Sequence, residues 1–297
     1  MMLSSEATRL AISVAANEFD PDFPDLHILP VAKLITHERS DPLRCLSLEE
    51  KLITDGILRN PPIVTPLFDD QDHFIVLDGA NRTGAFNRMG IQHILAQVVL
   101  PLEPALELRT WNQVVIGISP ETLLSQIEAL PGMEIRSVEE PATNYSGVSE
   151  QIEFMRIIFA DGKDLSGCVH KSGLFDRIKL LNAIMERLRE ISRVERTHLQ
   201  TIDPLREQFP GLAAMILFPG FKYDEIIQLV SAGGKIPAGI TRFIISPRAL
   251  RVNYPLSELR RNLPLEEKEK MFRDWLKMRV LQKGVRTYAE RTIMFDE

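Results

Sequence analysis

The spacing of hydrophobic residues predicts alternating strands and helices over the first third of the chain. Continuous apolar runs, which are typical of buried strands, lie at residues 26–34, 61–65, 74–77 and 93–100. Between them, residues 46–57 and 80–89 repeat their apolar positions with a helical period, and Gly56 closes the first of these helices. Strands and helices in this order predict an α+β domain.

The second half of the chain predicts a mixed α/β domain. Two apolar segments, 153–159 and 165–169, flank Asp161-Gly162-Lys163 and predict a β-hairpin. Helical patterns follow at residues 175–191, 204–209, 224–232 and 263–282. Because the pattern is interrupted between Trp111 and Glu121, we expect two domains, at residues 1–115 and 116–297.

Composition narrows the class of protein. The 297 residues carry 35 basic and 41 acidic side chains, a net charge of −6, which argues against a protein that holds DNA mainly by neutralising phosphates. The two cysteines, Cys45 and Cys168, lie too far apart in sequence to indicate a disulfide framework or a paired zinc site. No apolar run approaches the roughly twenty residues of a membrane span, and residues 1–20 lack a signal-peptide pattern. We therefore expect a cytoplasmic protein.

The most informative motif lies where an apolar run breaks at Asp78-Gly79 and helical spacing resumes. A strand, a sharp turn and a helix start leave backbone N–H groups unpaired, so phosphate oxygens can bind there. Arg82 adds a permanently charged donor, and Asp78 is suited to hold a magnesium ion or a transferable proton. The same residues are equally compatible with an Asp-Gly turn that precedes a capped helix.

Two further stretches extend this motif into a family resemblance. Asn60-Pro61-Pro62-Ile63-Val64, followed by Leu77-Asp78-Gly79-x-Asn81-Arg82, resembles the ParB/sulfiredoxin-like superfamily over about residues 23–115. The loop has neither the reactive cysteine of sulfiredoxins nor the Gly-Glu-Arg-Arg sequence of chromosome-partitioning proteins. Its Asp-Gly-x-x-Arg sequence, with His37-Glu38 upstream and Trp111 downstream, is similar to the free L-serine kinases, and residues 239–256 resemble the C-terminal segment of those kinases.

The resemblance implies a kinase that transfers a phosphoryl group from ADP or ATP to the hydroxyl of free L-serine, with Mg²⁺. The product, O-phospho-L-serine, would supply cysteine or siderophore synthesis. The first domain would bind the nucleotide, and the second would complete the substrate cleft. Glu38 would be the catalytic base, and Asp78 would orient the metal or the attacking hydroxyl.

The remaining site residues follow from the same resemblance. The predicted nucleotide contacts are Gly79, Ala80, Asn81, Arg82 and Thr83. The predicted substrate contacts are His37, Trp111, Thr241, Arg242 and Arg251. Two positions depart from the family pattern, because Phe243 stands where a histidine is expected and Asn81 replaces a histidine of some members. Both departures concern the substrate more than the phosphate chemistry.

Other functions remain open from the sequence. A ParB-like regulator would use the nucleotide as a gate for binding DNA or a partner, although the acidic balance argues against nucleic acid as a ligand. A regulator that keeps the kinase scaffold and responds to a ligand such as haem is a further alternative. Trp111, like most tryptophans in apolar stretches, is also compatible with a purely structural role. The oligomeric state is not encoded in any of these patterns.

Overall fold

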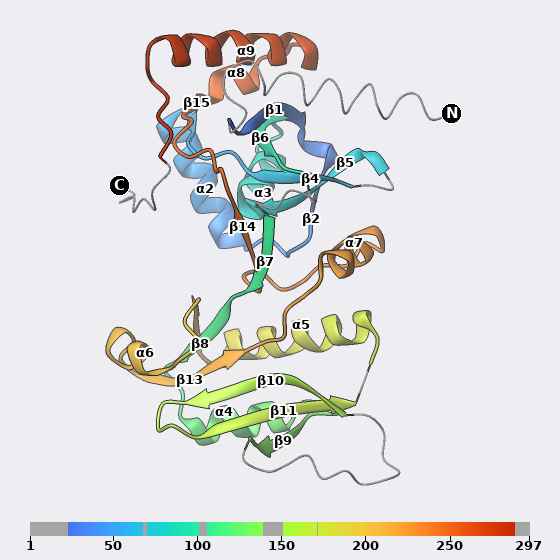
Figure 1. The fold of residues 1–297 in the computed structure, drawn as a ribbon, viewed down its shortest axis with the longest axis vertical. Coiled ribbons are helices and arrows are strands. Elements are labelled where there is room, and N and C mark those ends of the chain that lie inside the picture. Colours follow the sequence, from blue (N-terminus) through green and yellow to red (C-terminus); the bar gives the residue numbers. More distant parts are fainter. Residues whose placement is uncertain (1–22, 68–69, 101–105, 139–150, 171, 289–297) are drawn as a thin grey trace.

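The computed structural model describes residues 23–67, 70–100, 106–138, 151–170 and 172–288. These residues form two lobes, which lie one above the other in Figure 1. A two-stranded antiparallel ribbon of β7 (Leu106–Thr110) and β14 (Thr241–Ile245) runs between them. The fold is mixed α/β, as the sequence predicted.

The first lobe is built on a five-stranded sheet with the strand order β1-β6-β4-β5-β2. Its strands are β1 (Asp25–Pro30), β2 (Leu34–Thr36), β4 (Ile63–Leu67), β5 (Asp70–Asp78) and β6 (His93–Val98). Two helices, α2 (Pro42–Asp55) and α3 (Ala80–Arg88), pack against each other within this lobe. The single strand predicted at 26–34 is instead divided by a 3-10 turn, η1 (Val31–Lys33), which follows Pro30, a residue with no N–H for a sheet ladder.

The apolar run at the end of β5 is continuous because both faces of the sheet are covered. Phe74 and Val76 lie in the core of the first lobe, whereas Ile75 and Leu77 belong to a second core that continues into the second lobe. A strand that is buried on both faces shows no polar alternation. Asp78 is therefore the first polar position after the run, and it lies where the sheet opens toward the second lobe.

The second lobe contains an antiparallel six-stranded sheet with the order β12-β8-β13-β10-β11-β9. Its strands are β8 (Asn112–Ile116), β9 (Glu134–Ser137), β10 (Gln151–Phe159), β11 (Asp164–His170), β12 (Arg193–Thr197) and β13 (Leu212–Leu217). Its helices are α4 (Pro120–Glu128), α5 (Leu174–Ile191), α6 (Asp203–Gln208) and α7 (Tyr223–Ser231). The predicted hairpin is confirmed as β10 and β11, and α5, α6 and α7 each begin one residue before the predicted helix.

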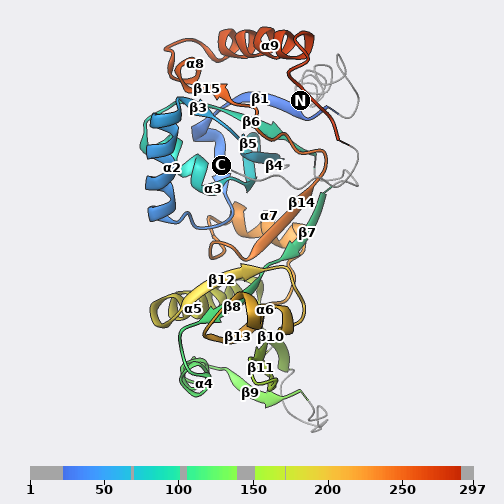
Figure 2. The same ribbon diagram turned by 90° about the vertical axis from the view of Figure 1, so that its left-hand side faces the viewer.

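The C-terminal helices return to the first lobe. β15 (Tyr254–Pro255) pairs with β3 (Ile57–Leu58), and α8 (Leu256–Arg260) and α9 (Leu265–Leu281) follow. Figures 1 and 2 show α9 lying across the end of the first lobe that carries β1. Tyr254 and Phe272 meet edge to face in the first-lobe core, with ring centroids 5.3 Å apart. The boundary expected near residue 115 stays a prediction. The apolar side chains of α8 and α9 come last in the chain, but they pack in the core of the first lobe.

Three other expectations concern the chain as a whole. Cys45 and Cys168 are buried and free, so they form no disulfide. Within the ranges given above, no helix combines the length and the hydrophobicity that crossing a bilayer requires. The N-terminal segment at residues 1–20, on which the expectation of no signal peptide rests, lies outside the described residues.

Candidate active site

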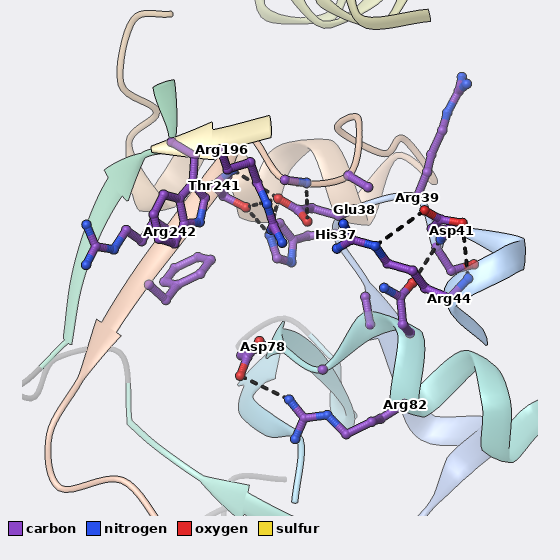
Figure 3. Close-up of a pocket in the computed structure, with 18 of the residues that line it drawn as sticks. His37, Glu38, Arg39, Asp41, Arg44, Asp78, Arg82, Arg196, Thr241 and Arg242 are labelled. Atoms are coloured by element: carbon purple, nitrogen blue, oxygen red, sulfur yellow. Dashed lines mark hydrogen bonds and ion pairs between the residues drawn. The ribbon is translucent and has the colours of Figure 1, made fainter. Parts of the chain in front are cut away.

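A cavity of about 1240 Å³ lies between the two lobes. The first lobe contributes the loop after β2 and the turn after β5, and the facing wall comes from α5, β8, β12 and the segment that leads into β14. The predicted residues that line it are His37, Glu38, Asp78, Gly79, Ala80, Asn81, Arg82, Trp111, Thr241 and Arg242. Two carboxylates far apart in sequence, Glu38 and Asp78, therefore share one cavity (Figure 3).

Asp78 and Gly79 form the sharp turn between β5 and α3. Gly79 has φ +96°, a left-handed conformation that L side chains rarely adopt. A Cβ at this position would lie 2.8 Å from Cβ of Pro62, so glycine is also required by packing. Within the described structure, no side chain caps the first turn of α3. Backbone N–H groups at this helix start are therefore available to an anion.

Two arginines set the charge of Asp78. The carboxylate oxygen Oδ2 lies 3.2 Å from Nη2 of Arg82, and Nη2 of Arg248 also pairs with it. Burial alone would raise the pKa of Asp78, but the two guanidinium charges and the N–H of Gly79 hold the pKa below its usual range. Asp78 is thus an anion. Its pair with Arg248 is a contact between the turn and the segment that follows β14.

Arg82 has a structural task besides any contact with a ligand. Its Nη1 donates hydrogen bonds to the carbonyl oxygens of Asn60, at 2.5 Å, and Pro61, at 2.9 Å. These contacts fix the segment against which Gly79 packs, so Arg82 holds both sides of the turn. The Nε–H and the remaining Nη2–H of the guanidinium have no hydrogen-bond partner among the described residues.

Glu38 joins the first lobe to residues 236–241. The N–H of Ile236 donates to the carbonyl of His37, and the N–H of Arg39 donates to the carbonyl of Ile236, each at 2.9 Å. These two bonds form a short parallel bridge outside the main sheets. We call the contact between residues 36–39 and 236–241 the Glu38 interface.

The carboxylate of Glu38 is held by backbone groups of that interface. Its Oε2 accepts the N–H of Gly239 at 2.9 Å. Its Oε1 accepts the N–H of Thr241 at 2.9 Å and also the Thr241 hydroxyl. A carboxylate offers about four acceptor sites, so one acceptor site on Oε2 has no donor among the described residues. The side chain is oriented by these contacts and still lines the cavity.

His37 lies behind Glu38 and is almost fully buried. Nδ1 lies 2.6 Å from the carbonyl oxygen of Val76 and therefore carries a hydrogen, while Nε2 lies 2.6 Å from the Thr241 hydroxyl. Burial lowers the pKa of His37, although Glu38 and the Val76 carbonyl oppose that shift. The imidazole is thus neutral, and the single hydrogen of the Thr241 hydroxyl, which is within reach of both Nε2 of His37 and Oε1 of Glu38, can be donated to only one of them at a time. The ring of Phe243 packs edge to face on His37, with centroids 5.4 Å apart, so the residue that replaces the expected histidine helps to bury this group.

Trp111 lines the cavity and is not a core residue. Its backbone N–H donates to the carbonyl of Ile240 at 2.8 Å. The guanidinium carbon of Arg242 lies 4.4 Å from the ring centroid and that of Arg196 lies 5.7 Å from it. These are cation–π distances, so the indole is surrounded by positive charge at the end of the cavity that carries Thr241.

Several cavity arginines were missed by the sequence analysis. They are Arg39, Arg44, Arg189 and Arg196. Each stands on a loop, helix or edge strand where an arginine usually signals only a solvated surface, so no local pattern could have selected them. Burial lowers the pKa of Arg189; Asp41 and Glu38 oppose this shift, and the like charges of Arg44 and Arg196 add to it. The lining is therefore strongly cationic, which suits a polyphosphate ligand.

Thr83 and Arg251 do not line the cavity. Thr83 is one helical turn beyond Gly79, so its side chain is buried on the core side of α3. Arg251 has φ +52° and its N–H donates to Oδ1 of Asn60 at 2.8 Å. Asn81 does line the cavity, but its Oδ1 accepts the N–H of Asp41 at 2.8 Å, which holds the loop before α2.

The side chains that line the cavity can be compared with the ligands that the expected Mg²⁺ requires. Among the described residues, no group of three or more histidine, cysteine or carboxylate side chains is arranged to hold an ion. Asp78 lies at the turn before α3, and its Oδ1 is outside both arginine pairs. Mg²⁺ commonly takes one or two carboxylates and completes its shell with water and substrate phosphates. The residues therefore fit a metal that is bound together with a nucleotide.

Comparison with known proteins identifies related sequences. No protein-family model matches the chain. The chain is 27% identical over 276 residues to the ATP-dependent L-serine kinase SbnI of Staphylococcus aureus, a match that covers 92% of this chain and 97% of SbnI. It is 33% identical over 109 residues to an ATP-dependent L-serine kinase of Staphylothermus marinus, covering 35% of this chain and 42% of that protein. The resemblance to free L-serine kinases expected from the motifs is confirmed.

Solved structures share the fold. A C-terminally truncated SbnI superposes with a TM-score of 0.64 at 22% identity and covers 87% of this chain and 97% of its own. A free serine kinase in complex with AMP gives a TM-score of 0.62 at 15% identity, with coverage of 79% of this chain and 93% of that one. Both lobes are thus part of an architecture already observed.

Proposed function

We propose that this protein is a free L-serine kinase, which transfers a phosphoryl group from a nucleotide to the serine hydroxyl. The observation that carries the proposal is the single cavity that Glu38 shares with the turn at Asp78-Gly79. Phosphoryl transfer needs a held nucleotide, stabilised charge and a group that accepts the hydroxyl proton. The names of the related kinases support serine as acceptor and make ATP the first donor to test, with ADP as the second.

The nucleotide phosphates would bind at the start of α3. The open N–H groups after Gly79 and the cationic lining both favour polyphosphate. Mg²⁺ would be held by Asp78 together with the phosphates, and when bound it reduces the charge repulsion met by the attacking oxygen. Arg82 and Arg248 would keep Asp78 ionised for this role.

Glu38 would act as the general base. The serine oxygen forms a bond to the terminal phosphorus, the bond from that phosphorus to the bridging oxygen breaks, and the hydroxyl proton passes to Oε2 of Glu38. The products are O-phospho-L-serine and the shortened nucleotide. Gly239 and Thr241 already orient the Glu38 carboxylate, so little conformational entropy of this side chain would be lost on reaching the transition state.

Finer assignments belong to the same proposal. On its motifs we assign the first lobe to the ParB/sulfiredoxin-like class. Arg242 and Trp111 would contact the amino acid, whereas Thr241 would act mainly through Glu38. The consuming pathway, a cytoplasmic location and the absence of nucleic-acid binding stay predictions.

Incubation of the full chain with a nucleotide panel, Mg²⁺ and free amino acids tests the proposal. Mass spectrometry should detect O-phospho-L-serine with ATP or ADP, and nucleotide consumption should depend on serine. Nucleotide hydrolysis without a phosphoamino acid would contradict it. Selective CTP binding with salt-sensitive retention of DNA would instead favour the ParB-like regulator.

A further inference from the structure

Both ring nitrogens of His37 are occupied by protein atoms. The residue is only 2% exposed. Its Nδ1 lies 2.6 Å from the carbonyl oxygen of Val76, its Nε2 lies 2.6 Å from the Thr241 hydroxyl, and Phe243 packs on the ring. Any effect of His37 on the chemistry of the cavity therefore has to pass through another residue.

The hydroxyl of Thr241 connects His37 to Glu38. It lies within hydrogen-bond distance of both Nε2 of His37 and Oε1 of Glu38 (Figure 3). Because Nδ1 carries the hydrogen that binds Val76, the neutral imidazole has no hydrogen on Nε2. An ionised carboxylate has no hydrogen either. Two acceptors thus compete for a hydroxyl that has one hydrogen to donate.

The outcome of this competition depends on the charge of Glu38. A hydrogen bond to a charged acceptor is stronger than one to a neutral acceptor, so the hydroxyl donates to Oε1 while Glu38 is ionised. The lone pairs of Nε2 and of the Thr241 oxygen then face each other across 2.6 Å. Once Glu38 takes up a proton on Oε2, its Oε1 is a weaker acceptor and the hydroxyl can turn to Nε2. Protonation of Glu38 therefore gains a buried hydrogen bond that the ionised form lacks.

We propose that His37 is a positioning residue that strengthens Glu38 as a base by competing for the hydroxyl hydrogen of Thr241. This deepens the proposed kinase function and rests on it for the identity of the reaction. The serine O–H bond breaks and its proton binds Oε2 of Glu38, while the hydrogen of Thr241 stays on its own oxygen and only changes direction. The N–H groups of Gly239 and Thr241 favour the ionised carboxylate, and the competition from His37 acts in the opposite sense.

Other charges around Glu38 form a constant background to this effect. They are Arg39 beside Glu38, Asp78 at the end of β5, Arg189 on α5, Arg196 on β12, Arg242 on β14, and Lys235, which reaches Thr36 of the Glu38 interface. Within the described ranges, none of these six forms an ion pair or a side-chain hydrogen bond with His37 or Glu38. A substitution of His37 leaves all of them in place, so their influence is common to the variants compared.

His37→Asn removes the competition and keeps the other contact. The asparagine amide can replace Nδ1 as donor to the Val76 carbonyl, but it places no acceptor at the position of Nε2. The hydroxyl of Thr241 then donates to Glu38 throughout, so the acid side of the kcat/KM profile should move to lower pH by about one pH unit, the scale of one hydrogen bond. We expect kcat at neutral pH to fall about threefold to tenfold, since a weaker base accepts the proton less readily. His198→Asn, at an exposed histidine outside the cavity, should change neither quantity.

A double-mutant cycle tests whether the effect passes through Thr241. Valine has the shape of threonine without the hydroxyl, so in a Thr241→Val background His37→Asn should leave the acid side of the profile unchanged. Thr241→Ser keeps the hydroxyl, and in that background the shift should return. A shift of equal size in all three backgrounds would overturn the proposal. A lower kcat without any shift in pH would also overturn it, because that result indicates a purely structural role for His37.

Nitrogen NMR of the histidine side chains follows the same hydrogen without catalysis. The chain has six histidines, and the signal of His37 is the one that His37→Asn removes. In the wild type, the Nε2 shift should move to that of a hydrogen-bond acceptor as Glu38 is protonated. In Glu38→Gln, which carries no charge, it should have that value at neutral pH already. Identical Nε2 shifts in the two proteins at neutral pH, or protonation of His37 itself in place of Glu38, would overturn the proposal.

The NMR measurement separates this role of His37 from the kinase function. If no phosphoserine forms but Nε2 of His37 responds to the charge of Glu38, the kinase proposal fails and the coupling stands. If phosphoserine forms and Nε2 does not respond, the kinase proposal stands and the role assigned to His37 is wrong.

Discussion

The two walls of the cavity are built in different ways. The turn from Asp78 to Arg82 is local, since a strand, a glycine and a helix start within five residues define it. The Glu38 interface is long-range, because Glu38 binds Gly239 and Thr241, which are more than two hundred residues away in the sequence. The comparison suggests that the turn is preformed in the first lobe, whereas the proposed base is oriented only when residues 236–241 are docked.

The largest expected effect comes from Glu38→Gln. An amide cannot take up the serine proton, so we expect kcat to fall by about 10²-fold to 10⁴-fold, the usual contribution of a general base. Nucleotide affinity should change little, because the turn after β5 is intact. Steady-state kinetics and nucleotide titration measure both quantities. A variant that keeps wild-type turnover would remove Glu38 from the chemistry.

The same substitution also tests the long-range interface. Glutamine has one acceptor oxygen where glutamate has two, so the N–H of either Gly239 or Thr241 loses its partner in this partly buried contact. We expect the free energy of unfolding to fall by about 1–3 kcal/mol. Glu195→Gln, at an exposed ion pair of the second lobe, is the control for loss of a carboxylate. If unfolding is unaffected, the interface does not depend on Glu38 for its stability.

Gly79→Ala tests the turn from Asp78 to Arg82, the wall of the cavity that is defined by local sequence. The added Cβ would lie 2.8 Å from Pro62 at a position with φ +96°. Gly90→Ala is a matched control, since Gly90 has φ +66° but an added Cβ there would meet no atom within 4 Å. We expect about 1–2 kcal/mol of destabilisation for Gly90→Ala from the backbone alone, and about 1–3 kcal/mol more for Gly79→Ala from overpacking. Denaturant unfolding compares them, and equal losses would show that contact with Pro62 is unimportant.

The difference between the walls also explains what could be read from the sequence. The turn was predictable because its chemistry lies within one stretch and Gly79 marks the break. Glu38, Trp111 and Thr241 were selected only through a family resemblance, since nothing in their spacing says that they meet. Arg196 was missed because an arginine on an edge strand has the pattern of a surface residue. Long-range register decides which such residues reach a cavity, and register is not a local property.

Particular residues also explain where the structure differs from what the sequence alone suggests. Thr83 belongs to the motif by sequence, but helical rotation turns its side chain into the core of the first lobe. The apolar run at 26–34 predicted one strand and contains two, separated by η1 after Pro30. The division at residue 115 stays a prediction, and chain order alone does not show that α8 and α9 pack in the core of the first lobe.

A second long-range contact provides a comparison away from the cavity. His27 on β1 contacts Asp25 at 2.8 Å and Glu269 of α9 at 3.1 Å. Burial opposes its charge, as does Arg273 at 2.9 Å from Nδ1, but the two carboxylates raise the pKa of His27 to about 9. A long-range contact of this kind should affect stability and leave the chemistry unchanged.

The sign of the pH dependence follows from the raised pKa. The folded protein holds the His27 proton more tightly than the unfolded chain, so the stabilisation is complete below about pH 6.5 and is lost as pH rises through about 9. We expect about 1–3 kcal/mol from this source. Denaturant unfolding between these pH values should show a steeper decline for the wild type than for His27→Gln, with His198→Gln as an exposed control. Parallel curves would mean that the protonated pair does not hold α9.

The smallest expected effect comes from Arg248→Met. Arg248 lies in the segment after β14 and pairs with Asp78 at the turn, so it connects the two walls of the cavity. Arg248→Met removes one of the two cations that face Asp78. The pKa of Asp78 should then rise toward its usual range, and the turn should lose positive charge near the proposed phosphate site. We expect nucleotide affinity to fall about tenfold at low salt, the scale of one charge-assisted contact.

Ionic strength distinguishes this charge effect from a change in shape. The Arg248–Asp78 pair is more than a third exposed, so the difference between wild type and Arg248→Met should shrink as salt screens it. Arg261→Met, which removes a surface arginine paired with Glu258, should bind nucleotide like the wild type. An affinity loss that is independent of salt would instead indicate that Arg248 positions the turn. The preformed character of the local wall would then depend on the same distant segment as the Glu38 interface.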